Sequence, residues 1–144
     1  MLKFFRDEGG VGAIEFAIIA PMLAIVLLGI MSGWAYYQQN GYMRDGLEVA
    51  GKYFLQGGTS EDTAESIATA AWSGKPADGT VAVTKTCICA GAAASCSGVC
   101  SDGSSVPETH WTIEASSIFN DPFFVNPIFP DGLALYEREV VRVR

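Results

Sequence analysis

The 144-residue sequence contains little of what most enzymes need. It has one histidine, His110, and no phosphate-binding glycine loop, G-x-S-x-G elbow or H-E-x-x-H metal motif. No pair of carboxylates is singled out by its spacing, so acid–base catalysis has no evident location. We therefore expect no catalytic residue, no cofactor and no enzyme activity.

Basic residues are also scarce, with nine lysines and arginines against 16 aspartates and glutamates and a formal net charge of −7. Nucleic-acid binding depends on lysines and arginines that neutralise phosphates. The basic residues cluster only at the C-terminal end, at Arg138, Arg142 and Arg144. We therefore do not expect nucleic acid as a partner.

Charge is absent from one long stretch, residues 16–40, whose first 18 residues are almost wholly apolar. A membrane-spanning helix needs about 20 apolar residues, because each residue rises about 1.5 Å and the hydrocarbon core is about 30 Å thick. Residues 11–37 meet this requirement and are expected to form a transmembrane anchor. Lys3 and Arg6 precede the anchor, so its N-terminus is expected on the cytoplasmic side.

The anchor opens with a glycine, four further residues, a glutamate and a phenylalanine, at Gly10, Glu15 and Phe16. A carboxylate inside a spanning helix costs about 2.5–3.5 kcal/mol on insertion scales, so Glu15 requires a partner. We expect this partner to be the charged amine that forms if the chain is cut between Gly10 and Val11. Pro21 removes a backbone donor six residues after Glu15 and is expected to kink the helix.

With these residues in register, the sequence resembles the TadE/TadF-like pseudopilins of tight-adherence (Flp-type, type IV pilin-like) pilus systems. The resemblance rests on the stretch from Gly9 to Pro21 and on the general plan of the chain. It implies a cleaved leader (1–10), an anchor helix (11–37) and an extracytoplasmic α+β domain (38–144). Whether the chain is closer to TadE or to TadF is left open.

The resemblance also implies a location and partners. The chain is expected in the bacterial inner membrane with its C-terminal domain in the periplasm, and its place in the basal machine, fibre or tip stays open. A prepilin peptidase would cut between Gly10 and Val11. Glu15, Phe16 and Pro21 would then contact other pilin or pseudopilin subunits, with membrane lipid and the tight-adherence inner-membrane machinery as further partners. In this family the glutamate is thought to meet the free amine of an adjacent subunit.

The N-terminus has two other interpretations, an ordinary signal peptide and an uncleaved anchor. An ordinary signal peptide has a shorter apolar region and a small-residue cleavage site after it, and no convincing site follows here. An uncleaved single-pass anchor carrying a binding or assembly module is the main alternative. It leaves the position of Gly10 and the presence of Glu15 unexplained.

Four cysteines fall within 14 residues, at Cys87, Cys89, Cys96 and Cys100. An even number in an exported domain favours two disulfide bonds around the loop 87–100. A zinc site is the weaker interpretation, because the spacing lacks paired C-x2-C knuckles, and free thiols are a third. Four cysteines allow three pairings, and we expect the nested one, Cys87 with Cys100 and Cys89 with Cys96.

The remaining pattern predicts an α+β domain. An amphipathic continuation of the first helix is expected to bury a stripe of apolar residues and to stop at Gly57-Gly58. This stripe consists of Met43, Leu47, Ala50 and Phe54. A second helix is expected over 60–73, followed by a small antiparallel sheet of about three strands over 81–89, 110–119 and 133–143. His110 is expected to lie at the surface.

The segment Asp121 to Gly132 contains three prolines and five large apolar residues. The prolines predict irregular structure. The segment is expected either to fold over the core as a loop or to form an exposed apolar contact surface for a neighbouring subunit.

Overall fold

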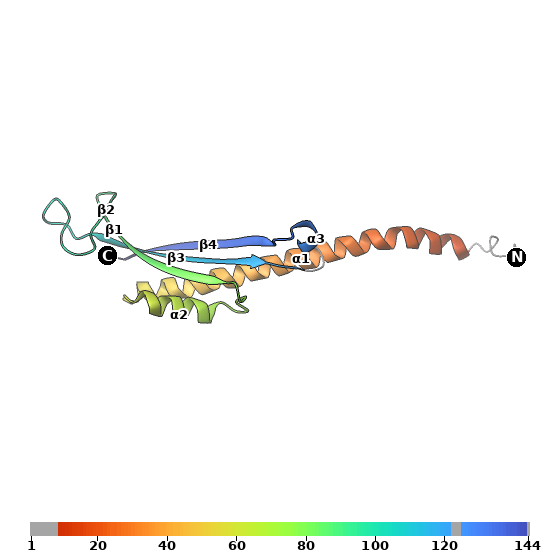
Figure 1. Cartoon of the computed structure of the whole chain (residues 1–144), viewed down its shortest axis with the longest axis horizontal. Coiled ribbons are helices and arrows are strands. Elements are labelled where there is room, and N and C mark those ends of the chain that lie inside the picture. Colours follow the sequence, from red (N-terminus) through yellow and green to blue (C-terminus); the bar gives the residue numbers. More distant parts are fainter. Residues whose placement is uncertain (1–8, 122–124, 144) are drawn as a thin grey trace.

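The computed structural model describes residues 9–121 and 125–143 of the chain. One long helix, α1 (Gly9–Leu55), forms the axis of the molecule, and its C-terminal half carries a head made of a second helix and a sheet (Figure 1). The predicted α+β class is therefore confirmed. Residues 1–8 of the expected leader lie outside the described residues.

Helix α1 has two halves with different surroundings. Its N-terminal half projects from the head, and within the described residues its most apolar window is not buried against the rest of the chain (Figure 1). Its C-terminal half buries Met43, Leu47, Ala50 and Phe54 almost completely, as the stripe predicted. The helix ends at Leu55, where Gly57 adopts a positive φ of 94° that glycine tolerates well.

Four strands form one antiparallel sheet in the described part of the chain, in the order β2-β1-β3-β4. The strands are β1 (Thr80–Cys89), β2 (Ala92–Ala94), β3 (Glu108–Phe119) and β4 (Leu133–Val143). The expected three strands are present, and β2 is an addition within a stretch expected to be a loop. Three alanines carry little strand propensity, and β2 forms because Ala90 and Gly91 both take positive φ angles in a two-residue hairpin turn.

The core lies between α1 and one face of the sheet, with α2 covering the part over β1 (Figure 1). Alternate residues of β3 point into it, and Trp111, Ile113, Ala115 and Phe119 are buried as predicted. The ring of Phe54 stacks on the ring of Trp111 with centroids 4.2 Å apart and an interplanar angle of 9°. This stacked pair joins the helix to the centre of the sheet.

Two glycines allow the close approach of α1 to its neighbours. A Cβ atom on Gly46 would lie 2.8 Å from the backbone oxygen of Ala68 in α2. One on Gly51 would lie 2.7 Å from Oε1 of Glu139 and 3.1 Å from Cγ2 of Val141, both in β4. From the sequence these glycines only weaken the helix by about 1 kcal/mol each relative to alanine, whereas in the fold they are sites of close packing.

Helix α2 (Glu61–Ala71) lies within the predicted range of 60–73 and ends two residues before its predicted end. Ser60 caps it, because its Oγ accepts a hydrogen bond from the backbone N–H of Thr63 at 3.3 Å. Ala64 and Ala68 are buried against α1, and Trp72 closes the edge of the core. The expected second helix is therefore present, and Ala64 and Ala68 form its buried face.

The proline-rich segment contains a short helix, α3 (Val125–Ile128), where irregular structure was expected. The prediction was wrong at these four residues because Pro127 lies in the first turn, where a backbone N–H has no partner within the helix. Val125 is buried against the core, whereas Ile128 and Phe129 are exposed. Residues 122–124 lie outside the described residues.

Two disulfide bonds tie the hairpin of β1 and β2 to the loop that follows, and the expectation of two bonds is confirmed. Their pairing is Cys87 with Cys96 and Cys89 with Cys100. The nested prediction was wrong because the hairpin turns at residues 90–91, directly after Cys89. Cys96 therefore returns beside Cys87, and Cys89 bonds to the later cysteine.

We expect mass spectrometry of partially reduced protein to recover Cys87 linked to Cys96 and Cys89 linked to Cys100. The bonds join residues nine and 11 positions apart, so each is expected to stabilise the head by about 3 kcal/mol through restriction of the unfolded chain. Four thiols that react with an alkylating reagent in oxidised protein would contradict both bonds.

Candidate functional site on the anchor helix

Glu15 is exposed on the first part of α1, and its carboxylate has no ion pair or hydrogen bond with any residue in the ranges 9–121 and 125–143. The next charged residue along the helix is Arg44, 29 positions later. At 1.5 Å per residue this is about 43 Å away, which is far beyond the reach of an ion pair. The partner of Glu15 is therefore not on the described part of its own helix.

Phe16 and Pro21 lie on the same exposed half of the helix. Helix α1 continues through Pro21, whose ring nitrogen cannot donate to the carbonyl of Ala17. The backbone carbonyl of Ala17, about half a turn after Glu15, therefore lacks its usual helical donor. The expected kink at Pro21 remains a prediction.

The surface around these residues is apolar on every side. An 18-residue window in this helix has a mean hydropathy of 2.5. The exposed large side chains include Ile14, Ile18, Ile19, Met22, Leu23, Ile25, Val26, Leu27, Ile30 and Met31. A soluble protein rarely leaves so large a continuous apolar surface in water, so this half of α1 is compatible with membrane anchoring.

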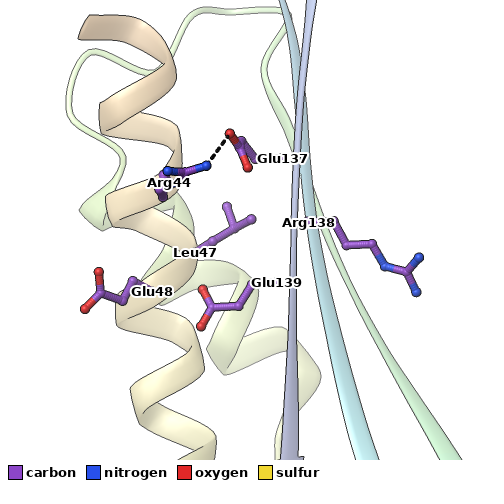
Figure 2. A pocket seen from close by; sticks show the side chains of 6 residues that line it. All are labelled: Arg44, Leu47, Glu48, Glu137, Arg138 and Glu139. Atoms are coloured by element: carbon purple, nitrogen blue, oxygen red, sulfur yellow. Dashed lines mark hydrogen bonds and ion pairs between the residues drawn. The ribbon is translucent and has the colours of Figure 1, made fainter. Parts of the chain in front are cut away.

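A cluster of charged side chains lies between α1 and β4 (Figure 2). An Nη atom of Arg44 lies 3.2 Å from Oε1 of Glu137, and Glu48 pairs with Lys52 on the helix at 2.7 Å. Partial burial raises the pKa of Glu139, and the nearby charge of Glu48 raises that pKa further. Because these side chains are partly or largely exposed, each pair contributes at most about 1 kcal/mol. Of the two, only the pair of Arg44 and Glu137 connects α1 to the sheet.

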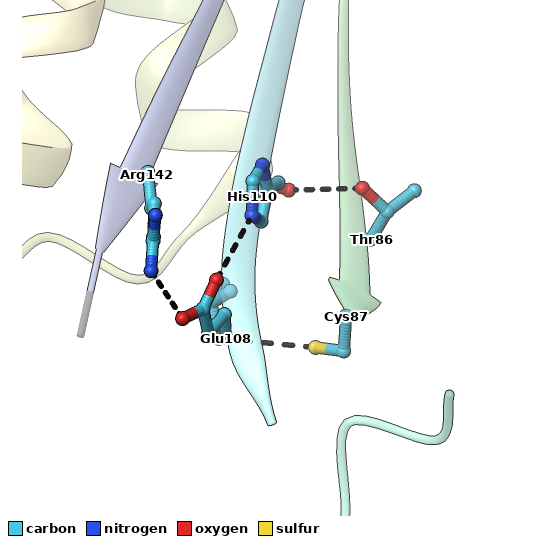
Figure 3. Close-up of polar contacts among 6 residues, drawn as sticks. Thr86, Cys87, Glu108, His110 and Arg142 are labelled. Carbon is cyan, nitrogen blue, oxygen red and sulfur yellow. Dashed lines mark hydrogen bonds and ion pairs between the residues drawn. The ribbon is translucent and has the colours of Figure 1, made fainter. Parts of the chain in front are cut away.

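His110 lies in a small polar network near the disulfide end of the sheet (Figure 3). Its Nε2 is 3.8 Å from Oε2 of Glu108, and the other oxygen of Glu108 contacts the guanidinium of Arg142. Thr86 donates a hydrogen bond from its hydroxyl to the backbone oxygen of His110 at 3.3 Å. The histidine is partly buried between β1 and β4, so the expected surface position is only partly correct.

No group of three or more histidine, cysteine, aspartate or glutamate side chains that could hold a metal ion is found in the described part of the chain. The four cysteines are consumed by the two disulfide bonds. The sequence singles out the motif around Glu15 as the candidate site, and the structure places it on the exposed apolar half of α1.

The fold and this site define a class of protein, in which one apolar helix compatible with a membrane anchor carries an α+β head. A family model described as TadE-like protein matches residues 10–44. The match is consistent with a TadE-like pseudopilin of tight-adherence pili and confirms the resemblance predicted from Gly10, Glu15, Phe16 and Pro21. No curated protein and no solved structure matches the chain.

Proposed function

We propose that this chain is a membrane-anchored pseudopilin that takes part in the assembly of a tight-adherence pilus. The observation that carries the proposal is Glu15, a carboxylate without a partner among the described residues on a helix surface that is otherwise apolar. An unpaired carboxylate is costly in hydrocarbon, and an ion pair there is screened far less than in water. An assembly in which a neighbour supplies a positive charge removes this cost.

A free amine at Val11 of an adjacent subunit is the positive charge that fits best. Cleavage between Gly10 and Val11 by a prepilin peptidase would create it, and Glu15 would then be the fifth residue of the mature chain. Pairing residue one of one subunit with residue five of another fixes the register of two anchor helices. The TadE-like match over the same helix supports this arrangement.

The cleavage site lies where α1 is easiest to unwind. Helix α1 begins at Gly9, so the bond between Gly10 and Val11 lies in its first turn. Each of the glycines at 9, 10 and 12 lowers helix stability by about 1 kcal/mol relative to alanine. A peptidase that binds an extended backbone therefore needs little free energy to unwind this turn.

We expect the chain extracted from the membranes of cells with an active prepilin peptidase to begin at Val11. Replacing Gly10 by isoleucine is expected to leave at least nine-tenths of the chain uncut, because the branched side chain hinders the scissile bond. Intact-mass analysis measures both results. Gly9→Ala is the control and should be processed like the natural chain, and a natural chain that begins at Met1 or beyond Tyr37 would refute cleavage at this site.

The alternative function is that of an uncleaved single-pass anchor for a binding or assembly module. The specific observation in its favour is that, among the described residues, the part of α1 that packs in the core of the head lies at and beyond Ala35. A plain anchor has no use for the carboxylate of Glu15 and should insert better without it. In both cases we place the chain in the inner membrane with its head in the periplasm.

A further inference from the structure

We propose that the head makes a second contact with the membrane through a short apolar element, which dips into the outer leaflet beside the anchor. This element is α3 together with Phe129, and it is called the foot here. The inference rests on the proposed membrane anchor, and it assigns a lipid-binding role to a segment outside the anchor and outside the TadE-like match.

The foot lies beside the part of α1 where the membrane is expected to end. Ser32 of α1 is 21 residues after Val11, which corresponds to about 32 Å of helix and to the thickness of a hydrocarbon core. Two exposed aromatic residues, Trp34 and Tyr37, follow at the level where aromatic side chains gather at a membrane interface. Figure 1 shows α3 alongside α1 at the end of the sheet nearest the anchor.

The exposed side chains of the foot are large and apolar. Ile128 is 56% exposed and Phe129 is 48% exposed, whereas Val125 of the same element is only 5% exposed and holds it to the core. The side chains of Ile128 and Phe129 therefore continue the apolar surface of the anchor onto the head.

Backbone N–H groups in and beside the foot are hydrogen-bonded within the protein, as membrane depth requires. The N–H of Phe129 donates to the backbone oxygen of Val125 at 2.7 Å, and the N–H of Gly132 donates to the backbone oxygen of Phe129 at 2.9 Å. The N–H of Asn126 donates to the backbone oxygen of Asp121 at 2.9 Å, and Pro127 has no N–H. The foot can therefore leave water while these backbone N–H groups keep their hydrogen bonds.

An apolar groove of about 240 Å³ separates the foot from α1. Its lining residues are Gly29, Ser32, Gly33, Tyr36, Phe119, Val125, Phe129 and Leu133. This groove is continuous with the anchor, because Gly29 and Gly33 belong to both. The acyl region of a lipid is therefore the occupant that fits both the position and the chemistry of the groove.

The charge around the foot favours apolar insertion over attraction to lipid headgroups. No lysine or arginine occurs in the sequence between Lys85 and Arg138, and Asp131 lies two residues after Phe129. The contact is therefore expected in uncharged phosphatidylcholine membranes and should be insensitive to salt.

The test uses the full chain in phosphatidylcholine vesicles. Each variant carries one added cysteine labelled with the polarity-sensitive fluorophore NBD, while the four native cysteines stay in their disulfide bonds. Phe129→Cys probes the foot, and Ile128→Cys is a second foot variant. Val140→Cys is the matched control, because Val140 is an apolar residue 51% exposed on β4, seven residues beyond the start of that strand. Met22→Cys, which is 69% exposed at the middle of the anchor, reports on the anchor itself.

We expect lipids with a spin label near the headgroup to quench the probe at Phe129 by at least half, with less quenching by a label deep in the acyl chain. The probe at Met22 should be quenched mainly by the deep label, and the probe at Val140 by neither. Quenching at Met22 with none at Phe129 and Ile128 would overturn the foot and leave the anchor intact. A blue-shifted but unquenched foot probe would also overturn it, because protein would then cover the foot. No quenching at Met22 would refute the anchor, and the foot with it.

Discussion

Replacing Phe54 by alanine is expected to lower the free energy of unfolding of the head by about 3–5 kcal/mol. The side chain is 0% exposed, and its ring stacks on that of Trp111 in the middle of the sheet. Truncation removes this contact and leaves a cavity that α1 cannot fill, because the helix is held on both sides by α2 and β4. A domain of ordinary stability, about 5–15 kcal/mol, would lose about a fifth of its stability or more.

Leu55→Ala is the matched control, because Leu55 follows Phe54 in the same helix and is 66% exposed. It should change stability by less than about 0.5 kcal/mol. Urea unfolding of the detergent-solubilised chain, followed by the change in tryptophan fluorescence as Trp72 and Trp111 become exposed, measures both variants. Equal midpoints for the two variants would contradict a core built on the C-terminal half of α1.

Replacing Glu15 by glutamine is expected to reduce the recovery of pilin or pseudopilin partners at least tenfold while leaving insertion and folding unchanged. Loss of one ion pair that is poorly screened in hydrocarbon is sufficient for this effect, since tenfold corresponds to about 1.4 kcal/mol. Co-purification after crosslinking in the same membranes measures the change, with the number of pili scored alongside.

Glu48→Gln is the matched control, because it makes the same substitution on the same helix at an exposed position of the head. It removes only the surface pair with Lys52 and should leave partner recovery unchanged. If the Glu15 and Glu48 variants recover equal amounts of partner, Glu15 has no role in assembly and the plain anchor is favoured.

Features with a local cause could be predicted from the sequence. The buried stripe ending at Phe54 repeats with the period of a helix, and β4 was predicted with the bounds that it has. The start of α2 is also set locally, because the side chain of Ser60 accepts a hydrogen bond from a backbone N–H only three residues away. The motif around Glu15 is also local, and the family match covers it.

Features that depend on distant parts of the chain could not be predicted. The pair of Arg44 and Glu137 joins residues 93 positions apart, and nothing in either neighbourhood indicates the other. The disulfide pairing depends on where the hairpin turns, which two positive φ angles at residues 90–91 decide. The close packing of Gly46 is set by the position of α2, so the sequence shows only a residue that weakens a helix.

The central claim is that the chain works as a processed subunit whose anchor helix packs beside other pilin-like helices through Glu15. Crosslinking in intact cells, capture through a C-terminal tag and intact-mass analysis of the captured complex test it most directly. The account predicts a captured chain that begins at Val11, with both disulfide bonds formed, crosslinked to another pilin or pseudopilin subunit. A captured chain that begins at Met1 and is crosslinked to no such subunit would contradict it.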